Sequence, residues 1–535
     1  MRRIQSAIDN HSAEFLGYKR NNEALVSEFK QKQHEAKHQR PQKDLARIER
    51  LGKMLAYQRV ELLLDTGTPF LELSSLAANE SRNGETAGAS VITGVGIVNG
   101  REVMIIANDG SVKGGAWYPL TIKKTIRALD IAIECHLPVV HLVDSAGGFL
   151  PMQADGFADK YMAGRIFRNQ CKLSALGVEQ IALSLGHCTA GGAYTPTLCD
   201  YSIIVRGTGA VFLGGPPLVK AATGEVVTAE ELGGADVHAS ISGTSDYAVS
   251  SEEEGIALVR EIVSTFQEKE KAKISRQEVE EPYYDPQELY GIIPDDIKKQ
   301  FDVREVIARI VDGSRFHEFK PDYGETIVCG YAYILGMKVG IIGNNGVLFC
   351  DSSKKATQFM LHCNRSRTPL VFLQNTTGFM VGKDYEHEGI SKDGAKMVMT
   401  QANLDVPKFT VMINGSFGAG SYGMCGRAFD GRFMFSWPNS KTAVMGAEQA
   451  AKTMADVQVA SLKRRGETVS DEKIQTVYDS VLENFEHQSS AYYTTSEIWD
   501  DGMIDPADTR KALGMAISAS LNADFEETSN GYLRI

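Results

Sequence analysis

The sequence contains an internal repeat of three motifs, so the fold has to accommodate two similar halves. GVGIVNGREVMIIANDG, VVHLVDSAGG and IALSLGHCTAGGAY in the first half are echoed by GYAYILGMKVGIIGNNG, LVFLQNTTGF and FTVMINGSFGAGSY in the second. The motifs keep their order and an offset of roughly 230 residues, which pairs Asp144 with Gln374 and Gly191 with Ala419. We therefore predict two structurally related domains that arose by duplication.

Within each half, helix and strand patterns alternate, which indicates α/β layering. A hairpin with its turn at Asn99-Gly100 is predicted over residues 91–115. A helix over 121–135 and a buried strand over 137–145 are predicted to follow it.

The domain boundary is predicted from a change in composition. Charge rises and prolines accumulate between residues 268 and 294, which is typical of a linker. We assign residues 1–285 to an N-terminal domain and 286–535 to a C-terminal domain. Residues 12–64 are expected to form a helical extension that docks on the N-terminal domain.

The composition argues against several classes of protein. A net charge of -12 disfavours non-specific nucleic-acid binding, which needs a basic surface. No apolar run is long enough to cross a membrane, and the N-terminus lacks the apolar core of a signal peptide. The 8 cysteines include no CxxC pair, so no metal site is predicted, and reduced thiols in a cytosol-like compartment are expected.

Two glycine-rich stretches carry the chemistry. GHCTAGGAYTP (186–196) and NGSFGAGSYGMC (414–425) each follow a short apolar run. A strand, a glycine-rich turn and a helix in this order place backbone N–H groups where they can hold a negative charge on an oxygen. A tight turn is the plain alternative for either stretch alone. Their duplication favours two oxyanion holes that face one another across an active site.

Longer motifs carry a resemblance to a known family. TPFLELSSLA, NDGSVKGGAWYPLTIKK, GHCTAGGAY, QNTTGFMVG and SFGAGSYGMCGRAFDGRFMFSWPNS resemble the carboxyltransferase (β) subunits of biotin-dependent acyl-CoA carboxylases, with methylcrotonyl-CoA carboxylase β subunits most similar. The resemblance runs nearly end to end. It implies an α/β fold of two tandem crotonase-like (ClpP/crotonase) domains, each a β-β-α superhelix. It also implies a hexameric β6 core, completed to α6β6 by subunits that carry biotin carboxylase and biotin. In such assemblies the N-terminal domain of one β subunit faces the C-terminal domain of another.

The resemblance also implies the reaction. A carboxyl group moves from carboxybiotin, carried on a separate subunit, to an acyl-CoA. Negative charge develops on the biotin ureido oxygen and on the enolate oxygen of the thioester, so two sets of donors are needed. Gly191 and Gly192 match the family's hole for the enolate, and Ala419 and Gly420 match its hole for the biotin oxygen. This scheme needs neither a side-chain base nor a metal ion in this chain.

Further binding residues follow from the same resemblance. On the acyl-CoA side they are Lys113, Gly114, Gly115, Ala163, Ala193, Gly214 and Gly215. On the biotin side they are Asn375, Thr376, Gly378 and Phe379. For the loop at Lys113, contact with a CoA phosphate and a plain loop are equal alternatives, and Asn375 has helix capping as its alternative.

One departure from the family pattern concerns the substrate. Methylcrotonyl-type sequences read roughly DSGGANLPRQ, with Phe before GRIF, whereas this chain has DSAGGFLPMQ and Ala163. A small residue there opens the acyl pocket, unless Phe149 refills the space or the change falls outside the pocket. The favoured substrate is the branched, α,β-unsaturated 3-methylcrotonyl-CoA. The alternative is geranyl-CoA or another longer acyl-CoA, which places the enzyme in leucine or isoprenoid catabolism.

Three rival functions fit the sequence less well. A crotonase-fold hydratase or isomerase needs one domain with acidic catalysts near the glycine-rich turn, and a non-catalytic scaffold has no use for intact turns. The third is a decarboxylase subunit of a sodium pump, which runs related chemistry in reverse. The sequence has no ATP-grasp phosphate loop and no biotinylation tetrapeptide, which predicts a separate biotin-carrying partner. The expected location is the cytoplasm of a bacterium or the mitochondrial matrix of a eukaryote.

Overall fold

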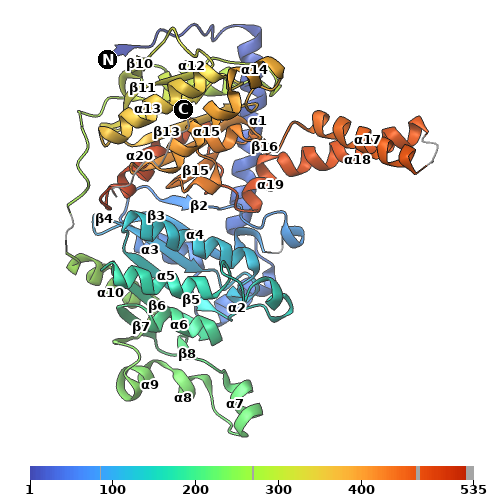
Figure 1. The fold of residues 1–535 in the computed structure, drawn as a ribbon. Coiled ribbons are helices and arrows are strands. Elements are labelled where there is room, and N and C mark those ends of the chain that lie inside the picture. Colours follow the sequence, from blue (N-terminus) through green and yellow to red (C-terminus); the bar gives the residue numbers. More distant parts are fainter. Residues whose placement is uncertain (85, 268–269, 466–469, 526–535) are drawn as a thin grey trace.

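The computed structural model describes residues 1–84, 86–267, 270–465 and 470–525, and it contains two eight-stranded sheets, one in each half (Figure 1). The first sheet has the order β2-β3-β4-β5-β6-β7-β9, with β8 also paired to β6. Its strands are β2 (Leu71–Leu73), β3 (Val91–Val98), β4 (Arg101–Asn108), β5 (Val139–Ser145), β6 (Gln180–Thr189), β7 (Tyr201–Val205), β8 (Ala210–Phe212) and β9 (Tyr247–Val249).

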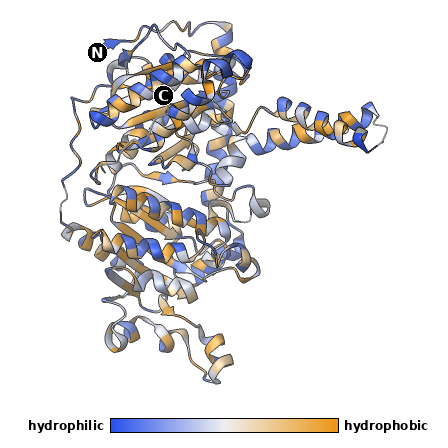
Figure 2. Cartoon of the chain, viewed as in Figure 1, coloured by the Kyte–Doolittle hydropathy of each residue, from blue (hydrophilic) through white to orange (hydrophobic). Residues whose placement is uncertain are grey.

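The second sheet has the order β1-β10-β11-β12-β13-β14-β15, with β16 also paired to β14. Its strands are β1 (Arg2–Arg3), β10 (Arg315–Phe319), β11 (Ile327–Ile334), β12 (Met337–Asn344), β13 (Leu370–Thr376), β14 (Lys408–Phe417), β15 (Phe433–Ser436) and β16 (Lys441–Ala443). In both sheets the hydrophobic residues concentrate in the strands (Figure 2).

Helices cover the sheets and connect their strands. In the first half these are α1 (Ala13–His38), α2 (Gln42–Arg50), α3 (Ala56–Leu63), α4 (Pro119–Cys135), α5 (Gly164–Ala175), α6 (Tyr194–Thr197), α7 (Pro216–Thr223), α8 (Ala229–Gly233), α9 (Ala235–Val237) and α10 (Glu252–Thr265). In the second half they are α11 (Leu289–Ile292), α12 (Val303–Ile310), α13 (Cys350–Arg365), α14 (Lys383–Glu388), α15 (Ile390–Ala402), α16 (Gly420–Gly423), α17 (Ala447–Arg464), α18 (Asp471–Ser489), α19 (Ala491–Ser496) and α20 (Thr509–Ser520). None of the described helices is long and apolar enough to span a membrane.

The two sheets confirm the predicted α/β duplication. Each has an antiparallel hairpin followed by parallel strands, and each shifts register near the end of its second parallel pair, β5–β6 in the first sheet and β13–β14 in the second. The register corrects one predicted pairing by a single residue. The amide of Asp144 donates to Asn108 Oδ1 at 3.4 Å, and the amide of Asn375 donates to Asn344 Oδ1 at 3.2 Å. Asp144 therefore corresponds to Asn375, not to Gln374; a one-residue slip would reverse every side chain of the strand.

The predicted hairpin is β3–β4. Asn99 and Gly100 have φ of 48° and 73°, the left-handed pair that a tight two-residue hairpin turn requires. Both amides donate to the carboxylate of Asp65, at 2.9 and 2.8 Å. The side-chain cap and the backbone preference thus act together to fix the turn.

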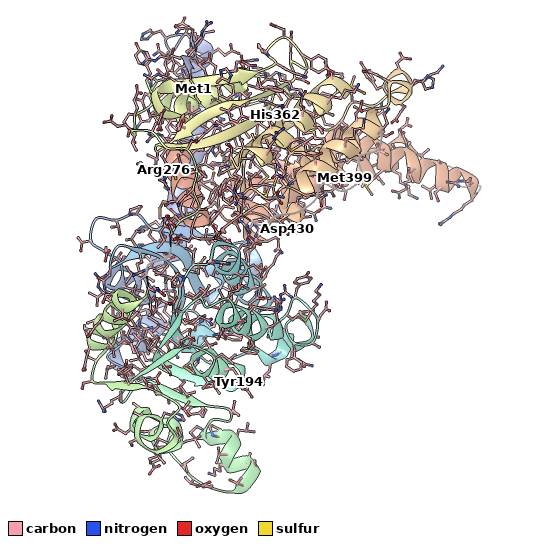
Figure 3. The ribbon with its side chains drawn as sticks, turned by 60° about the vertical axis from the view of Figure 1, so that its left-hand side comes forward. Met1, Tyr194, Arg276, His362, Met399 and Asp430 are labelled. Atoms are coloured by element: carbon pink, nitrogen blue, oxygen red, sulfur yellow. The ribbon has the colours of Figure 1, made fainter. Side chains whose placement is uncertain are left out.

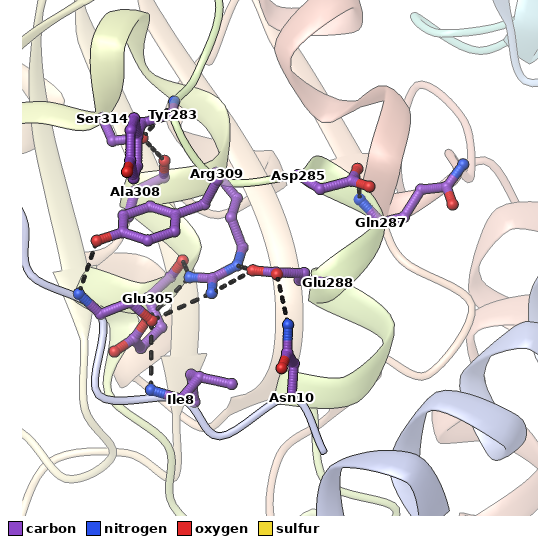
Figure 4. Close-up of polar contacts among 12 residues, drawn as sticks. Ile8, Asn10, Tyr283, Asp285, Gln287, Glu288, Glu305, Ala308, Arg309 and Ser314 are labelled. Carbon is purple, nitrogen blue, oxygen red and sulfur yellow. Dashed lines mark hydrogen bonds and ion pairs between the residues drawn. The ribbon is translucent and has the colours of Figure 1, made fainter.

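The helical extension contacts both halves. The residues before the extension lie on the second sheet, where β1 pairs with β10. Ser6 Oγ and the Ala7 amide donate to the Glu305 carboxylate at 2.6 and 2.8 Å. Figure 4 shows Arg309 between Glu305 and Glu288. Helix α1 packs against α11, whereas α3 packs against α10 of the first half. Helix α1 also contacts the first half, where Lys37 pairs with Glu72 at 2.5 Å. Residues 12–64 therefore lie against both halves, and the boundary at residue 285 stays a prediction.

Candidate functional site

The first glycine-rich turn follows the end of β6. A short 3-10 helix (Ala190–Ala193) begins directly after Thr189 and leads into α6. Thr189 is the cap residue, and its side chain makes no capping hydrogen bond. The first amides of a helix have no partner within the helix, so this turn presents uncapped N–H groups.

Packing within the protomer does not require glycine at this turn. A Cβ built on Gly191 would lie 3.5 Å from the Phe167 ring, and one on Gly192 would lie 4.0 Å from Ser145 Oγ. These are ordinary contacts, and neither residue has a positive φ. Gly191 is partly exposed whereas Gly192 is buried, so the close approach to the backbone that glycine permits is available at Gly191.

The second turn has the same position after β14 but a tighter packing. Ala419 is the cap residue of α16 and, like Thr189, makes no side-chain capping bond. A Cβ on Gly420 would lie 2.8 Å from Thr376 Oγ1 and 2.9 Å from Gly378 Cα. Glycine at position 420 is therefore required by the fold itself, unlike glycine at position 191.

A cleft of about 480 Å³ opens beside the second turn. Its lining includes Gly418, Ala419, Tyr422, Val444, Phe485 and Trp499. All of its lining residues belong to the second half. Helix α18, which with α17 projects from the body as a hairpin, forms one wall of the cleft (Figure 1).

The loop at Lys113 lies next to the first turn. Lys113, Gly114 and Gly115 have φ of 49°, 71° and 69°, and a Cβ on Gly115 would lie 2.1 Å from the carbonyl oxygen of Asp144. Ser145 Oγ donates to the Gly115 carbonyl at 2.8 Å. Two residues beyond Ser145, a Cβ on Gly147 would lie 3.0 Å from the carbonyl oxygen of Thr189. The predicted loop and the predicted oxyanion turn thus pack on the same short segment.

Lys113 also lines a second cleft, of about 490 Å³, together with Arg40 and Lys43. These cations come from the start of the chain, before and within α2. Arg40 is paired with Asp109 at 2.8 Å, and Arg47 donates to the carbonyl of Gly110 at 2.5 Å. The helical extension therefore contributes basic groups to the surface beside the loop.

The remaining residues predicted for the acyl-CoA side are more dispersed. Ala163 immediately precedes α5, four residues before Phe167, and Ala193 is buried at the end of the first turn. Gly214 and Gly215 lie between β8 and α7, where their built Cβ atoms contact Leu218 and Phe212. The stretch that follows forms α7.

The residues predicted for the biotin side lie behind the second turn. Asn375 and Thr376 are buried in β13. Asn375 Oδ1 accepts from Asn414 at 3.1 Å, and Thr376 Oγ1 accepts from the Gly378 amide at 3.1 Å. Phe379 packs over glycines of α15 and α16. The adjacent cleft is lined by other residues, so these four support the turn from within.

A buried charge network beneath the first turn was missed from the sequence. The Asp144 carboxylate accepts from Lys53 at 3.0 Å and from Arg59 at 3.1 Å, and Arg59 also pairs with Glu252 at 2.6 Å. Burial alone would lower the pKa of Arg59, but the two carboxylates hold it above its usual value. A Cβ on Gly186 would lie 1.9 Å from Asp144 Oδ1, so this network explains the first glycine of GHCTAGGAY.

Two α/β domains, each with uncapped amides at a glycine-rich strand end, define a protein of the crotonase-like class. The described residues contain no cluster of His, Cys, Asp and Glu that could hold a metal ion. All eight cysteines are free thiols.

Comparison with known proteins identifies the family within this class. A family model described as the carboxyl transferase domain matches residues 49–530. The probable methylcrotonoyl-CoA carboxylase beta chain of Drosophila melanogaster is 50% identical over 99% of this chain and 95% of its own length. A biotin-dependent 3-methylcrotonyl-coenzyme A carboxylase beta1 subunit of Mycobacterium tuberculosis is 49% identical over 90% of this chain and 92% of its own. The crystal structure of the P. aeruginosa geranyl-CoA carboxylase beta subunit covers 99% of both chains, with a TM-score of 0.88 and 39% identity.

The chain therefore belongs to the carboxyl transferase domain family, and it is a carboxyltransferase component of the biotin-dependent acyl-CoA carboxylase type. The fold and the activity expected from the motifs are confirmed. The roles of individual site residues stay predictions.

Proposed function

We propose that this chain transfers the carboxyl group of carboxybiotin to 3-methylcrotonyl-CoA. The observation that supports this most is the pair of uncapped turns in a chain about half identical to methylcrotonoyl-CoA carboxylase beta chains. Biotin, carried by a separate subunit, supplies the carboxyl group and takes up a γ-proton of the unsaturated thioester, which leaves a dienolate with negative charge on the thioester oxygen. The amides of Gly191 and Gly192 hold the enolate oxygen of the acyl-CoA, and those of Ala419 and Gly420 hold the ureido oxygen.

The other predicted residues serve binding. The loop of Lys113, Gly114 and Gly115 lies against the segment that supports the first turn, which suits the pantetheine arm of the substrate. Lys113 and Lys43 line the basic side of the neighbouring cleft, where CoA phosphates bind. Gly378 contacts Gly420 directly, and Asn375, Thr376 and Phe379 hold the biotin-side turn in place.

A second copy of the chain completes the active site. Figure 3 shows Tyr194, next to the first turn, in the lower half of the molecule and Asp430, after the second turn, in the upper half. Large hydrophobic side chains are exposed in both halves: Leu150, Phe157 and Tyr194 in the first, and Val381, Tyr422 and Val444 in the second. Exposed apolar surface of this kind is typical of an interface. We assign it to a β6 core within an α6β6 assembly, with a biotin carboxylase/biotin carrier α subunit as partner.

A longer acyl group is the second candidate substrate. Ala163 stands one helical turn before Phe167, whose ring borders Gly191, so a small residue at 163 leaves room beside the turn. The similarity to the geranyl-CoA carboxylase beta subunit also favours a longer acyl group as substrate.

The test is a panel of acyl-CoAs with the reconstituted holoenzyme. Turnover of 3-methylcrotonyl-CoA well above geranyl-CoA supports the first proposal, and the reverse order supports the second. If Ala163 sets the length limit, Ala163→Phe removes activity with geranyl-CoA and preserves it with 3-methylcrotonyl-CoA. Absence of carboxylation with every acyl-CoA, or of a biotinylated partner in a streptavidin blot after pull-down, contradicts the function. The relatives include mitochondrial and bacterial proteins, and the location proposed is correspondingly the mitochondrial matrix or the bacterial cytoplasm.

A further inference from the structure

The segment 496–503, here called the Trp499 loop, belongs to the second half but is held by the first. The amide of Ala78 donates to the Ser496 carbonyl at 2.9 Å, and the amide of Ser74 donates to the Asp501 carbonyl at 2.7 Å. Lys123 of α4 donates to the Glu497 carbonyl at 2.6 Å. Contacts from the first half thus run along most of the loop.

The strongest of these contacts is an ion pair at Asp501. Arg127 of α4 donates through Nε and Nη2 to both carboxylate oxygens, at 2.8 and 2.9 Å, and Arg427 donates to the same carboxylate at 2.7 Å. Arg127 Nη2 also donates to the carbonyl of Gly431 at 3.0 Å. Burial alone would raise the pKa of Asp501, but the two guanidinium groups hold it below its usual range. A planar guanidinium that makes this many bonds fixes the orientation of the loop.

The loop presents one large side chain to a ligand site. Trp499 is 39% exposed and lines the cleft beside Ala419. Its ring packs against Tyr493, at 5.7 Å between centroids, and Asp500 anchors the next position through Ser436 and Thr495. Tyr422, Val444 and Phe485 line the same cleft. Aromatic and apolar walls of this kind suit a compact ring system better than a charged group.

We propose that Trp499 contacts the ring system of biotin in this cleft, and that Arg127 is a positioning residue that sets the place of Trp499 from the first half. The inference rests on the proposed carboxyl transfer, in which Ala419 and Gly420 bind the ureido oxygen. A substrate bound by backbone amides on one side needs a wall on the other, and Trp499 supplies that wall. Trp499 and Arg127 lie outside the glycine-rich motifs, so the sequence repeat does not predict a role for them.

Tryptophan fluorescence tests the contact directly. The chain has 3 tryptophans. Trp117 and Trp437 are 7% and 0% exposed, so a ligand-dependent change reports chiefly on Trp499. Titration of the purified full chain with biocytin is expected to change the emission in a saturable way. Trp499→Phe abolishes this change, and the matched variant Trp117→Phe keeps it. A change that survives in Trp499→Phe, or one produced by acyl-CoA and not by biocytin, overturns the proposal.

Kinetics separate a ligand contact from a merely structural role. In transfer of the carboxyl group from carboxylated acyl-CoA to biocytin, Trp499→Ala is expected to raise the KM for biocytin about tenfold. The KM for the acyl-CoA is expected to stay within about twofold. Equal effects on both KM values, or none on the biocytin KM, contradict the role. Biocytin-dependent fluorescence in the absence of any carboxyl transfer would leave this binding role intact while refuting the proposed reaction.

Arg127→Lys tests the positioning role, because lysine keeps the charge and loses the planar fork. We expect faster acrylamide quenching of Trp499 and a raised biocytin KM at unchanged acyl-CoA KM. Arg206→Lys is the matched control, since its pair with Asp236 is 44% and 69% exposed. If Arg127→Lys loses stability without moving either quenching or the biocytin KM, Arg127 is structural only.

Discussion

Replacement of Gly191 by alanine is expected to remove carboxyl transfer from a protein that remains fully folded. The new methyl group would lie 3.5 Å from the Phe167 ring, an ordinary van der Waals contact, at a position without positive φ. Alanine also restricts the unfolded chain more than glycine does, which stabilises a compatible site by roughly 0.4–1 kcal/mol. The melting temperature should therefore stay unchanged or rise slightly.

The effect on catalysis follows from the close approach that glycine permits. If the amide at position 191 holds the enolate oxygen, a methyl group beside it displaces the thioester. Loss of one such donor costs roughly 2.7–4 kcal/mol of transition-state stabilisation, or about 100- to 1,000-fold in kcat. The assay is carboxylation of 3-methylcrotonyl-CoA by the reconstituted holoenzyme, with thermal unfolding measured on the same preparation.

Gly420→Ala provides the contrast. Its methyl group would lie 2.8 Å from Thr376 Oγ1, and overpacking of this kind costs roughly 1–3 kcal/mol of folding stability. Loss of activity in that variant says little about mechanism, because the fold is perturbed as well. Gly191→Ala is the decisive variant: a folded protein with wild-type kcat and KM refutes the assignment of the first turn to the enolate.

Two further predictions concern buried charges. Burial raises the pKa of Asp500 from 3.8 to about 6. Protonated Asp500 therefore contributes its full stabilisation of the folded state below pH 3.8, and this contribution is lost as the pH rises through about 6. The change in unfolding free energy caused by Asp500→Asn should therefore be more favourable at pH 7.5 than at pH 4, by about 2–3 kcal/mol. Urea unfolding at the two pH values measures this difference, and an equal effect at both contradicts the titration of Asp500. Arg59→Met leaves two buried carboxylates without their shared partner and should cost about 3–5 kcal/mol. The matched variant Arg260→Met, in a partly exposed pair, should cost about 1 kcal/mol, and equal melting temperatures would argue against the buried network.

Local features and repeats were predictable from the sequence. The duplication, the Asn99-Gly100 hairpin and both glycine-rich turns are encoded in short stretches, because turn chemistry and strand patterning depend on neighbouring residues. The one-residue error at Asp144 has the same origin. A motif comparison fixes the order of elements, whereas the ladder of hydrogen bonds fixes the register, and Asn108 and Asn344 reveal it.

Contacts between distant parts of the chain required the tertiary structure. Arg59 meets Glu252, Arg127 meets Asp501, and the N-terminal strand joins the second sheet, each across a long stretch of sequence. Periodicity and motif spacing do not predict such pairs, because buried charges and edge strands become stable only through partners that the folded chain brings close. The motifs thus specify two turns that can hold oxyanions. Only the tertiary structure shows that a methyl group fits at Gly191 and that it would clash at Gly420. It also shows that Trp499, which the first half holds in place, lines the cleft beside the second turn.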